Sequence, residues 1–344
     1  MHASNKRLVY IGFAFRHHKG TQAGYHHIKD YLKYDKIIDC QWEWDWMTFS
    51  TQSKLLKFVK ALYFKIFRIG FFWSLIKCTY LAIFCKNQIF HVIYAENTYK
   101  FLHHIIGKTN KIVCTYHQPI AIIDKHQDWV NDIINVDKVI FMSQKDINWT
   151  RLLTGKDNVY FIPHGINTDF FYPDENIIRD RNILMVGTWL RDFEFANSVF
   201  EFFLEEFADI NITVVTDDKN HNFFKLNERL YLLRGISDER LRGFYRKSCC
   251  LFLPLSSFTA NNSILEAAAT GCPIVVATDY VDESYFTDKQ IDILPLEKEV
   301  VCNHIKNMIN SKYDASKMND IRRFVIDNYS WDVVSERTKA VLLS

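Results

Sequence analysis

Residues 253–279 read LPLSSFTANNSILEAAATGCPIVVATD, and they predict an apolar strand, a polar loop, a helix and a second strand. The first strand ends at Pro254, and a helix rich in small residues begins near Asn262. The three alanines at 267–269 let such a helix pack closely on a sheet, and Pro273–Ala277 predicts the next buried strand. This order of elements is typical of a parallel sheet covered by helices.

The start of this helix has the features of an anion-binding site. Backbone N–H groups in the first turn have no partner within the helix, and the helix dipole adds positive potential there. Asn261, Asn262 and Ser263 add side-chain donors and capping groups. Glu266, about one turn further along, can accept hydrogen bonds from sugar hydroxyls. An ordinary capped helix with a solvated Glu266 explains the same residues.

Strands and helices alternate over the whole chain. In the C-terminal half we predict strands at 182–186, 210–215, 230–233, 249–253 and 273–277, with helices at 195–207, 238–246 and 264–270. In the N-terminal half we predict strands at 8–13, 91–94, 111–116, 138–142 and 159–162, with helices at 98–106, 125–134 and 144–153. The predicted fold class is α/β, with two doubly wound, Rossmann-like domains that face a central cleft and bind ligands at the carboxyl ends of their strands.

The chain has 344 residues, enough for two domains. We expect an N-terminal domain at 1–170, a C-terminal domain at 171–325 and a closing helix at 326–344 that packs back on the N-terminal domain. Residues 1–170 contain 22 Lys and Arg against 13 Asp and Glu, whereas the remaining residues contain 20 against 27. One half is basic and the other acidic, so we expect the halves to meet different partners. Eight scattered cysteines without a C-x-x-C spacing, and no secretory signal, indicate a cytosolic protein with reduced thiols.

Residues 46–95 contain no acidic residue, but they contain seven Lys or Arg between many large apolar residues. Lys77 interrupts the most apolar part, so no uncharged run is long enough to predict a membrane-spanning helix. Lys and Arg mixed with Phe, Trp and Leu over residues 54–86 are typical of a helix that lies in the membrane surface. A pair of core helices with solvated basic faces is the alternative interpretation.

Residues 253–279 resemble the C-terminal "glycosyltransferase group 1" domain of retaining, family-four-like glycosyltransferases of the GT-B fold. In that family an apolar strand, a loop and an L-E-A-x-A-x-G-x-P-x-V run carry the nucleotide-sugar site. Four further stretches resemble family segments in the same order, namely FIPHGINTDFFYP (161–173), ILMVGTWLRDF (183–193), RGISDERLRGFYRKSCCLFLPLS (234–256) and YSWDVVSERTKAV (329–341). The resemblance covers most of residues 138–341 and implies a GT-B fold and a nucleotide-sugar donor.

The resemblance also implies a donor-binding set, which consists of Gly187, Thr188, Arg191, Gly235, Ile236, Asn261, Asn262, Ser263 and Glu266. Glu266 would hold the donor ribose, Arg191 would lie near the diphosphate, and Gly235 would lie against the base. Two positions depart from the family pattern. The family often has a second Glu eight residues before the matched one, where this sequence has Phe258, and an Arg directly after the Gly, where it has Thr188.

Three features of the N-terminal half could face the same ligands. His117 follows the strand at 111–116 and resembles the family's active-site His, so we predict His117 and Glu266 as the catalytic residues, with a His of no function as the alternative. Glu96 follows the preceding strand, and we expect it to face the acceptor. Gly20 and Gly24 could let the backbone approach the acceptor or a phosphate, although a simple turn explains them equally well.

We expect no metal and no cofactor. Metal-dependent glycosyltransferases of the other common fold use a D-x-D pair, and Glu43-Trp44-Asp45 matches that pattern only weakly. The paired histidines at 17–18 and 26–27 lack the helical spacing of a zinc site. In the GT-B interpretation Arg191 and helix N–H groups balance the charge of the diphosphate.

Together these patterns predict a retaining hexosyl- or related glycosyltransferase that takes part in surface polysaccharide or lipopolysaccharide assembly. The expected partners are a nucleotide diphosphate sugar, a glycan or lipid-linked acceptor, and an anionic membrane surface that residues 54–86 contact from the cytoplasm; no nucleic acid is expected. A GT-B sugar-nucleotide epimerase, a phosphorylase and a nucleotide-sugar-binding protein without turnover remain alternatives.

Overall fold

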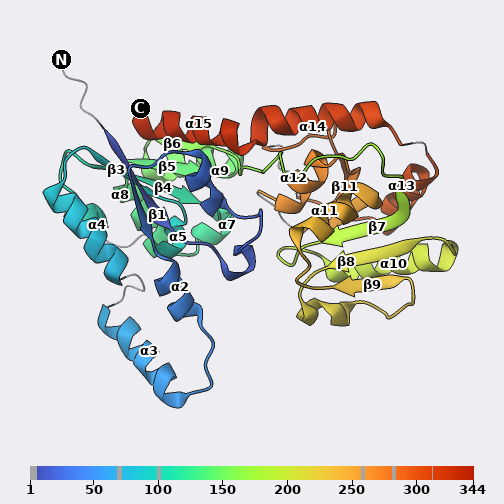
Figure 1. The fold of residues 1–344 in the computed structure, drawn as a ribbon, viewed down its shortest axis with the longest axis horizontal. Helices are drawn as coiled ribbons and strands as arrows, with labels where there is room; N and C mark the ends of the chain where they lie inside the picture. Colours follow the sequence, from blue (N-terminus) through green and yellow to red (C-terminus); the bar gives the residue numbers. More distant parts are fainter. Residues whose placement is uncertain (1–5, 68–71, 99–101, 257–259, 281–283, 312) are drawn as a thin grey trace. The chain divides into compact units, whose positions relative to one another are not determined.

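The computed structural model describes all residues except 1–5, 68–71, 99–101, 257–259, 281–283 and 312, and it leaves the side chains of 63–67 and 121 undescribed (Figure 1). The chain divides into unit 1, which contains residues 1–164 and 334–344, and unit 2, which contains residues 165–333. The boundary predicted before residue 326 falls inside a continuous helix, α14 (Ala315–Tyr329). The chain closes with a separate helix, α15 (Trp331–Leu343).

The described part of unit 1 has a six-stranded parallel sheet with the strand order β2-β1-β3-β4-β5-β6. The strands are β1 (Arg7–Gly12), β2 (Lys36–Asp39), β3 (Gln88–Val92), β4 (Lys111–Tyr116), β5 (Lys138–Phe141) and β6 (Val159–Phe161). The central strands β3 and β4 are almost completely buried, as expected for a parallel sheet with both faces covered. The strand order reverses between β1 and β3, and ligands of such sheets bind at this position.

The helices of unit 1 are short except near residues 54–84. They are α1 (Ile28–Tyr31), α2 (Gln41–Thr48), α3 (Lys54–Phe67), α4 (Phe72–Phe84), α5 (Ala95–Thr98), α6 (Leu102–Ile105), α7 (Ile120–Ile123), α8 (Gln127–Asn135) and α9 (Gln144–Thr154). Ser143 caps α9 because its hydroxyl accepts a hydrogen bond from the Lys145 N–H, and Gly155 ends this helix with a left-handed φ of 63°.

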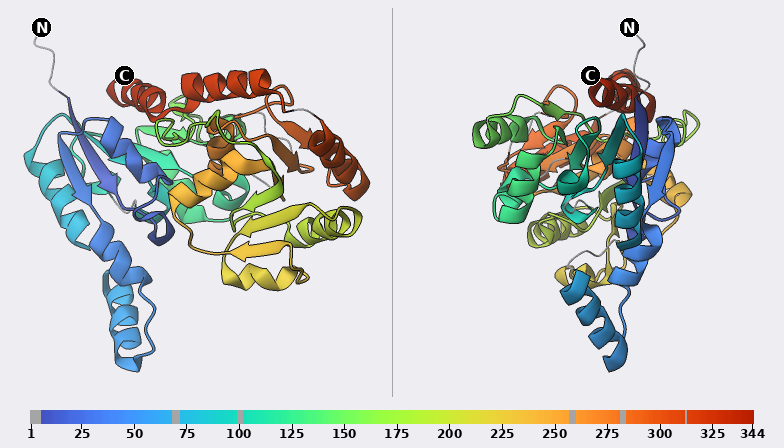
Figure 2. Two further views of the ribbon diagram at one scale, coloured as in Figure 1. Left: turned by 45° about the vertical axis from the view of Figure 1, so that its right-hand side comes forward. Right: turned by 90° about the vertical axis from the view of Figure 1, so that its left-hand side faces the viewer.

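Helix α3 extends away from the sheet of unit 1 (Figures 1 and 2). Its described side chains are exposed or partly exposed, including Leu55 at 71% and Phe58 at 64%. Lys60 connects α3 to the end of α2, because its ammonium donates to the carbonyls of Met47 (3.0 Å) and Phe49 (2.6 Å). α3 is therefore a projecting helix rather than part of a buried core pair.

None of the helices in the described ranges is both long and apolar enough to cross a membrane.

The described part of unit 2 also has a six-stranded parallel sheet, with the order β12-β11-β10-β7-β8-β9. The strands are β7 (Asp180–Val186), β8 (Asn211–Val215), β9 (Leu230–Leu233), β10 (Ser248–Pro254), β11 (Ile274–Ala277) and β12 (Asp292–Leu294). The helices are α10 (Phe193–Glu206), α11 (Asp238–Lys247), α12 (Asn262–Ala269), α13 (Lys298–Asn310) and α14. This is the strand order of the Rossmann fold, and it reverses between β7 and β10. The predicted α/β class with two doubly wound, parallel sheets is confirmed.

Candidate functional site

The point in unit 2 where the strand order reverses is formed by the loops that follow β7 and β10. Backbone hydrogen bonds join the two loops, since the Asp192 N–H donates to the Pro254 carbonyl (3.1 Å) and the Ser256 N–H donates to the Leu190 carbonyl (3.2 Å). Because ligands of doubly wound sheets bind outside the carboxyl ends of the strands at this position, the joined loops are the candidate site of unit 2.

Arg191 is fixed between these loops. Its guanidinium donates to the carbonyls of Val186 (3.0 and 3.2 Å) and Trp189 (2.8 Å) in its own loop. It also donates to Asn261 Oδ1 (3.3 Å) and Ser263 Oγ (3.5 Å) at the start of α12. Burial lowers the pKa of Arg191 to about 10, which still leaves it a cation at neutral pH. The structure therefore brings together a fixed positive charge and the start of α12.

Gly187 lets Arg191 approach its own loop closely. The φ of Gly187 is 110°, and a Cβ atom there would lie 2.5 Å from Arg191 Nη2. Only glycine adopts this φ without strain and leaves room for the guanidinium. Thr188 lies beside it, with its hydroxyl oxygen 3.3 Å from that of Thr216.

The start of α12 differs in one respect from the prediction. Asn261 is the N-cap residue, but its side chain does not cap the helix, because Oδ1 accepts from Arg191 instead. The prediction of side-chain capping is therefore wrong for Asn261. Among the residues that the structure describes, no hydrogen bond acceptor is found for the backbone N–H of Asn262 or Ser263. These two groups are available to an anion.

Glu266 is buried, with only 4% of its surface exposed, so the interpretation as a solvated residue is wrong. The Tyr245 hydroxyl donates a hydrogen bond of 2.9 Å to Glu266 Oε2. Burial raises the pKa of Glu266 to about 8, and the hydrogen bond from Tyr245 acts in the opposite direction. A buried carboxyl group whose pKa is close to neutral pH is typical of functional sites.

Gly235 and Ile236 follow β9 at the same edge of the sheet. Gly235 is exposed with a φ of 58°, and Ile236 is half-buried. Within the described chain, neither residue forms a hydrogen bond or ion pair with Arg191 or Glu266, so their expected role beside the base stays a prediction. Phe258 lies outside the described residues.

In unit 1 the structure brings His117 and Glu96 together at the carboxyl ends of β3 and β4. The backbone N–H of His117 donates to Glu96 Oε1 (3.2 Å), and the ring nitrogen Nδ1 of His117 lies 3.6 Å from the same oxygen. The His117 ring lies against the rings of Tyr94 and Tyr25, with centroid distances of 4.6 and 4.9 Å. Glu96 Oε2 and His117 Nε2 are buried, and neither finds a hydrogen-bond partner within the described residues. Buried polar atoms without partners are rare in folded proteins, and a bound ligand is one explanation for them.

The two predicted glycines of unit 1 have different surroundings. Gly20 has a φ of 73°, and a Cβ atom added there would meet no described atom within 4 Å, as expected for a simple turn. At Gly24, with a φ of 106°, a Cβ atom would lie 2.6 Å from His18 Nδ1 and 2.8 Å from His26 Nδ1. Burial lowers the pKa of His18 to about 2 and that of His26 to about 4, so both imidazoles are neutral near pH 7. These histidines offer hydrogen-bonding groups but no positive charge.

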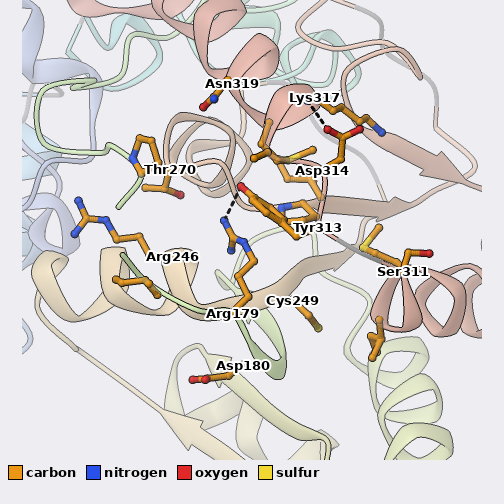
Figure 3. A pocket seen from close by; sticks show the side chains of 18 of the residues that line it. Arg179, Asp180, Arg246, Cys249, Thr270, Ser311, Tyr313, Asp314, Lys317 and Asn319 are labelled. Atoms are coloured by element: carbon orange, nitrogen blue, oxygen red, sulfur yellow. Dashed lines mark hydrogen bonds between the residues drawn. The ribbon is translucent and has the colours of Figure 1, made fainter. Parts of the chain in front are cut away.

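A pocket of about 940 Å³ lies elsewhere in unit 2, at the amino ends of β7, β10 and β11 (Figure 3). Arg179 lies in it, and its guanidinium donates to the carbonyls of Tyr245 (2.9 Å), Ser248 (2.8 Å) and Gly271 (2.5 Å). These bonds hold the chain together at this edge of the sheet, which is opposite to the edge that carries Arg191.

The weak D-x-D match lies within α2 and has structural contacts. Glu43 is buried and accepts hydrogen bonds from the N–H groups of Trp73 (2.7 Å) and Ser74 (3.2 Å), so it caps α4. Asp45 pairs with Lys19. Over the ranges that the structure describes, no cluster of three or more His, Cys, Asp or Glu has the arrangement of a metal site.

No protein-family model and no curated protein matches the sequence. Solved structures do match, and the similar ones include several GT-B glycosyltransferases, so the chain has the GT-B fold. A glycosyltransferase from Rickettsia africae ESF-5 has a TM-score of 0.63 at 15% identity, with 98% of each chain covered. Anabaena Alr3699/HepE in complex with UDP and glucose has a TM-score of 0.63 at 10% identity, with 98% of this chain and 100% of that chain covered. S. aureus TarM in complex with UDP has a TM-score of 0.63 at 11% identity, and the match covers 79% of this chain but only 59% of TarM.

Tyr245 is the site residue that sequence reasoning missed. It lies in the stretch 234–256, which resembles the nucleotide-side segment of the family. Its hydroxyl meets Glu266 from a different helix, and helical spacing within α11 carries no information on that contact.

Proposed function

We propose that the chain is a retaining glycosyltransferase that moves a sugar from a nucleotide diphosphate donor to an acceptor hydroxyl. The observation that carries this proposal is the arrangement in unit 2, where Arg191 lies beside two N–H groups of α12 that have no acceptor among the described residues, and the buried Glu266 follows one turn along the same helix. A cation and helix N–H groups suit a diphosphate, and a buried carboxyl group suits a ribose diol. The GT-B fold, and the UDP and UDP-glucose bound in similar structures, support this donor class.

The proposed mechanism relies on electrostatic stabilisation. As the bond between the anomeric carbon of the sugar and the diphosphate oxygen breaks, negative charge develops on the leaving diphosphate. Arg191 and the N–H groups of Asn262 and Ser263 stabilise this charge. These donors are fixed before the reaction, so little reorganisation is needed. The positive charge of the diphosphate site comes from the protein, and no metal takes part. The retaining outcome rests on the family resemblance.

The residues of unit 1 act on the sugar and the acceptor. His117 and Glu96 present two buried atoms without partners among the described residues, which suit hydroxyl groups of a sugar. The neutral histidines beside Gly24 also suit hydroxyl groups better than a phosphate. We therefore assign Gly24 to the acceptor rather than to a phosphate.

The projecting helix α3 would bind the cytoplasmic face of a membrane. Leu55, Phe58 and Leu62 recur at helical spacing and are exposed, while Lys54 and Lys57 provide exposed positive charge. This combination suits an anionic lipid surface. A lipid-linked acceptor, such as a precursor of a surface polysaccharide or lipopolysaccharide, fits an enzyme in this position.

Product analysis with radiolabelled nucleotide sugars tests the proposal. The chain is incubated with UDP-, GDP- or ADP-sugars and a lipid extract as acceptor, with and without EDTA. We expect label in the lipid fraction, a released nucleoside diphosphate and no effect of EDTA. Complete loss of activity with EDTA would contradict the metal-free mechanism.

Incubation of the chain with the nucleotide sugar alone, without an acceptor, distinguishes the alternative functions. An epimerase converts the nucleotide sugar without any acceptor, and a binding protein without turnover forms no product under any condition. Either result would contradict the proposed transfer.

A further inference from the structure

Tyr245 and Glu266 form a buried pair between two helices of unit 2. Tyr245 lies on α11 with no exposed surface, and Glu266 lies on α12 with 4% exposed. The bond from the Tyr245 hydroxyl to Glu266 Oε2 is 2.9 Å long. In the part of the chain that the structure describes, this is the one hydrogen bond to the Glu266 carboxyl group. The other oxygen, Oε1, is left for a further donor.

Tyr245 itself is held firmly. Its carbonyl accepts a hydrogen bond of 2.9 Å from Arg179, and its ring lies at an edge-on angle 6.4 Å from the Phe171 ring. A buried side chain with fixed neighbours keeps one rotamer, so the direction of its hydroxyl is also fixed. Glu266 has three rotatable side-chain bonds, and a single fixed donor selects one orientation of its carboxyl plane.

The hydrogen bond also makes Glu266 easier to ionise, against the larger effect of burial. Burial favours the neutral form of a carboxyl group, whereas a donated hydrogen bond favours the carboxylate. Asp238 on α11 is the charged group that acts on Glu266, and it raises the pKa of the carboxyl group. Arg322 on α14 donates to the Ala269 carbonyl at the end of α12, and Arg191 donates to Ser263 at its start. Among the residues that the structure describes, only Tyr245 donates a hydrogen bond to the Glu266 carboxyl group.

We propose that Tyr245 is a positioning residue of the donor site, whose hydroxyl orients the Glu266 carboxyl group and favours its ionised form, so that it accepts hydrogen bonds from the ribose hydroxyls of the nucleotide sugar. This inference rests on the proposed function, because it presumes that Glu266 binds the donor. Tyr245 itself touches neither sugar nor diphosphate. Removing the Tyr245 hydroxyl would change the protonation and the orientation of Glu266, and through them the affinity for the donor.

The variant Tyr245→Phe tests this role, and Tyr329→Phe is its matched control. Tyr329 is also a buried tyrosine of unit 2, and its hydroxyl donates to the Tyr285 carbonyl instead. The affinity for the nucleotide sugar that wild type binds best is measured by calorimetry from pH 6 to pH 9. Titration of the Glu266 carboxyl carbon is followed by carbon-13 NMR, with Glu266→Gln to assign the signal.

In Tyr245→Phe we expect Glu266 to titrate about one pH unit higher and the affinity at pH 7 to fall about tenfold. The loss should shrink toward pH 9, where the carboxyl group ionises without help. Tyr329→Phe should match wild type in both measurements. In a Glu266→Gln background, Tyr245→Phe should cause no further loss, because the carboxylate on which it acts is gone.

A loss in Tyr245→Phe that is equal at every pH, or an unshifted Glu266 titration, would overturn the role of Tyr245 while leaving the proposed function in place. Failure of the wild-type chain to bind any nucleotide sugar would overturn the proposed function itself. The two failures are therefore distinguishable.

Discussion

Arg191 shows how one side chain organises the candidate donor site. Its guanidinium joins the loop after β7 to Asn261 and Ser263 at the start of α12. It reaches this position only because Gly187 has no side chain. The position of the fixed charge beside the start of α12 thus depends on a single close contact.

Replacing Gly187 by Ala should destabilise the chain more than replacing Gly235 by Ala. Both glycines have a positive φ, but only at Gly187 would the new Cβ atom meet a described neighbour, namely Arg191 Nη2 at 2.5 Å. We expect a loss of about 2–3 kcal/mol for Gly187→Ala and about 1 kcal/mol for Gly235→Ala. Urea denaturation measures both, and equal losses would show that Arg191 moves aside without cost.

Glu266 should make stability depend on pH in a predictable direction. Its pKa is raised from 4.5 to about 8 in the folded chain, so between these values the folded chain keeps a proton that the unfolded chain has lost. The stabilisation linked to this proton is complete at low pH and is lost as the pH rises toward 8. Glu266→Gln removes this titration.

The free energy of unfolding of Glu266→Gln, relative to wild type, should therefore increase between pH 5 and pH 8 and then level off. The slope cannot exceed about 1.4 kcal/mol per pH unit. Urea denaturation at four pH values measures it. A difference that stays constant over this range would show that Glu266 is ionised throughout.

Among the helices of unit 1, the projecting helix α3 is the clearest departure from a compact α/β unit. Lys60 fixes its base by donating to two carbonyls at the end of α2, so this lysine is not available to a lipid headgroup. Lys54 and Lys57 are exposed and have no such contact among the described residues. The membrane prediction therefore rests on these two lysines and on the exposed apolar residues Leu55, Phe58 and Leu62.

The double variant Lys54→Glu/Lys57→Glu should weaken binding to vesicles of equal phosphatidylglycerol and phosphatidylcholine by at least about tenfold at low salt, since each cation contributes about 1 kcal/mol. Lys108→Glu/Lys125→Glu is the control, because it makes the same charge change at exposed positions elsewhere in unit 1. The difference should shrink at high salt. If both variants sediment equally with vesicles, α3 is an ordinary solvated helix and the membrane prediction is wrong.

The sequence predicted the buried elements of the fold better than the half-exposed ones. Apolar runs such as those of β7 and β10 gave correct strands, because strands buried on both faces consist of continuous apolar residues. β2 and β12 were missed, since each has at most four residues, of which only two are apolar. The equally short edge strands β6 and β9 were predicted because all their residues are apolar or aromatic.

The candidate site could be predicted only in part, for a related reason. Short runs of sequence and the family resemblance singled out Arg191, Ser263, Glu266 and His117 as site residues, and their roles stay predictions. Contacts between distant segments, such as Tyr245 with Glu266 or Glu96 with His117, depend on how helices and strands pack. Periodicity along one helix does not encode them.

The chain consists of two Rossmann-like units, each with polar groups gathered where its strand order reverses. Unit 2 offers a cation, the N–H groups at the start of α12 and a carboxyl group, whereas unit 1 offers the neutral His18 and His26 together with Glu96. This division of chemistry suits a reaction between a charged nucleotide donor and an uncharged acceptor, and it fits the GT-B fold that the chain shares with solved glycosyltransferases.

Calorimetric titration of wild type, Glu266→Ala and Glu194→Ala with UDP-, GDP- and ADP-sugars tests the donor site most directly. Glu194 is an exposed glutamate of the same unit and serves as the control. We expect one nucleotide class to bind wild type and Glu194→Ala equally, and Glu266→Ala to lose at least about tenfold in affinity. Nucleotide-sugar binding that survives unchanged in Glu266→Ala would contradict the proposed donor site.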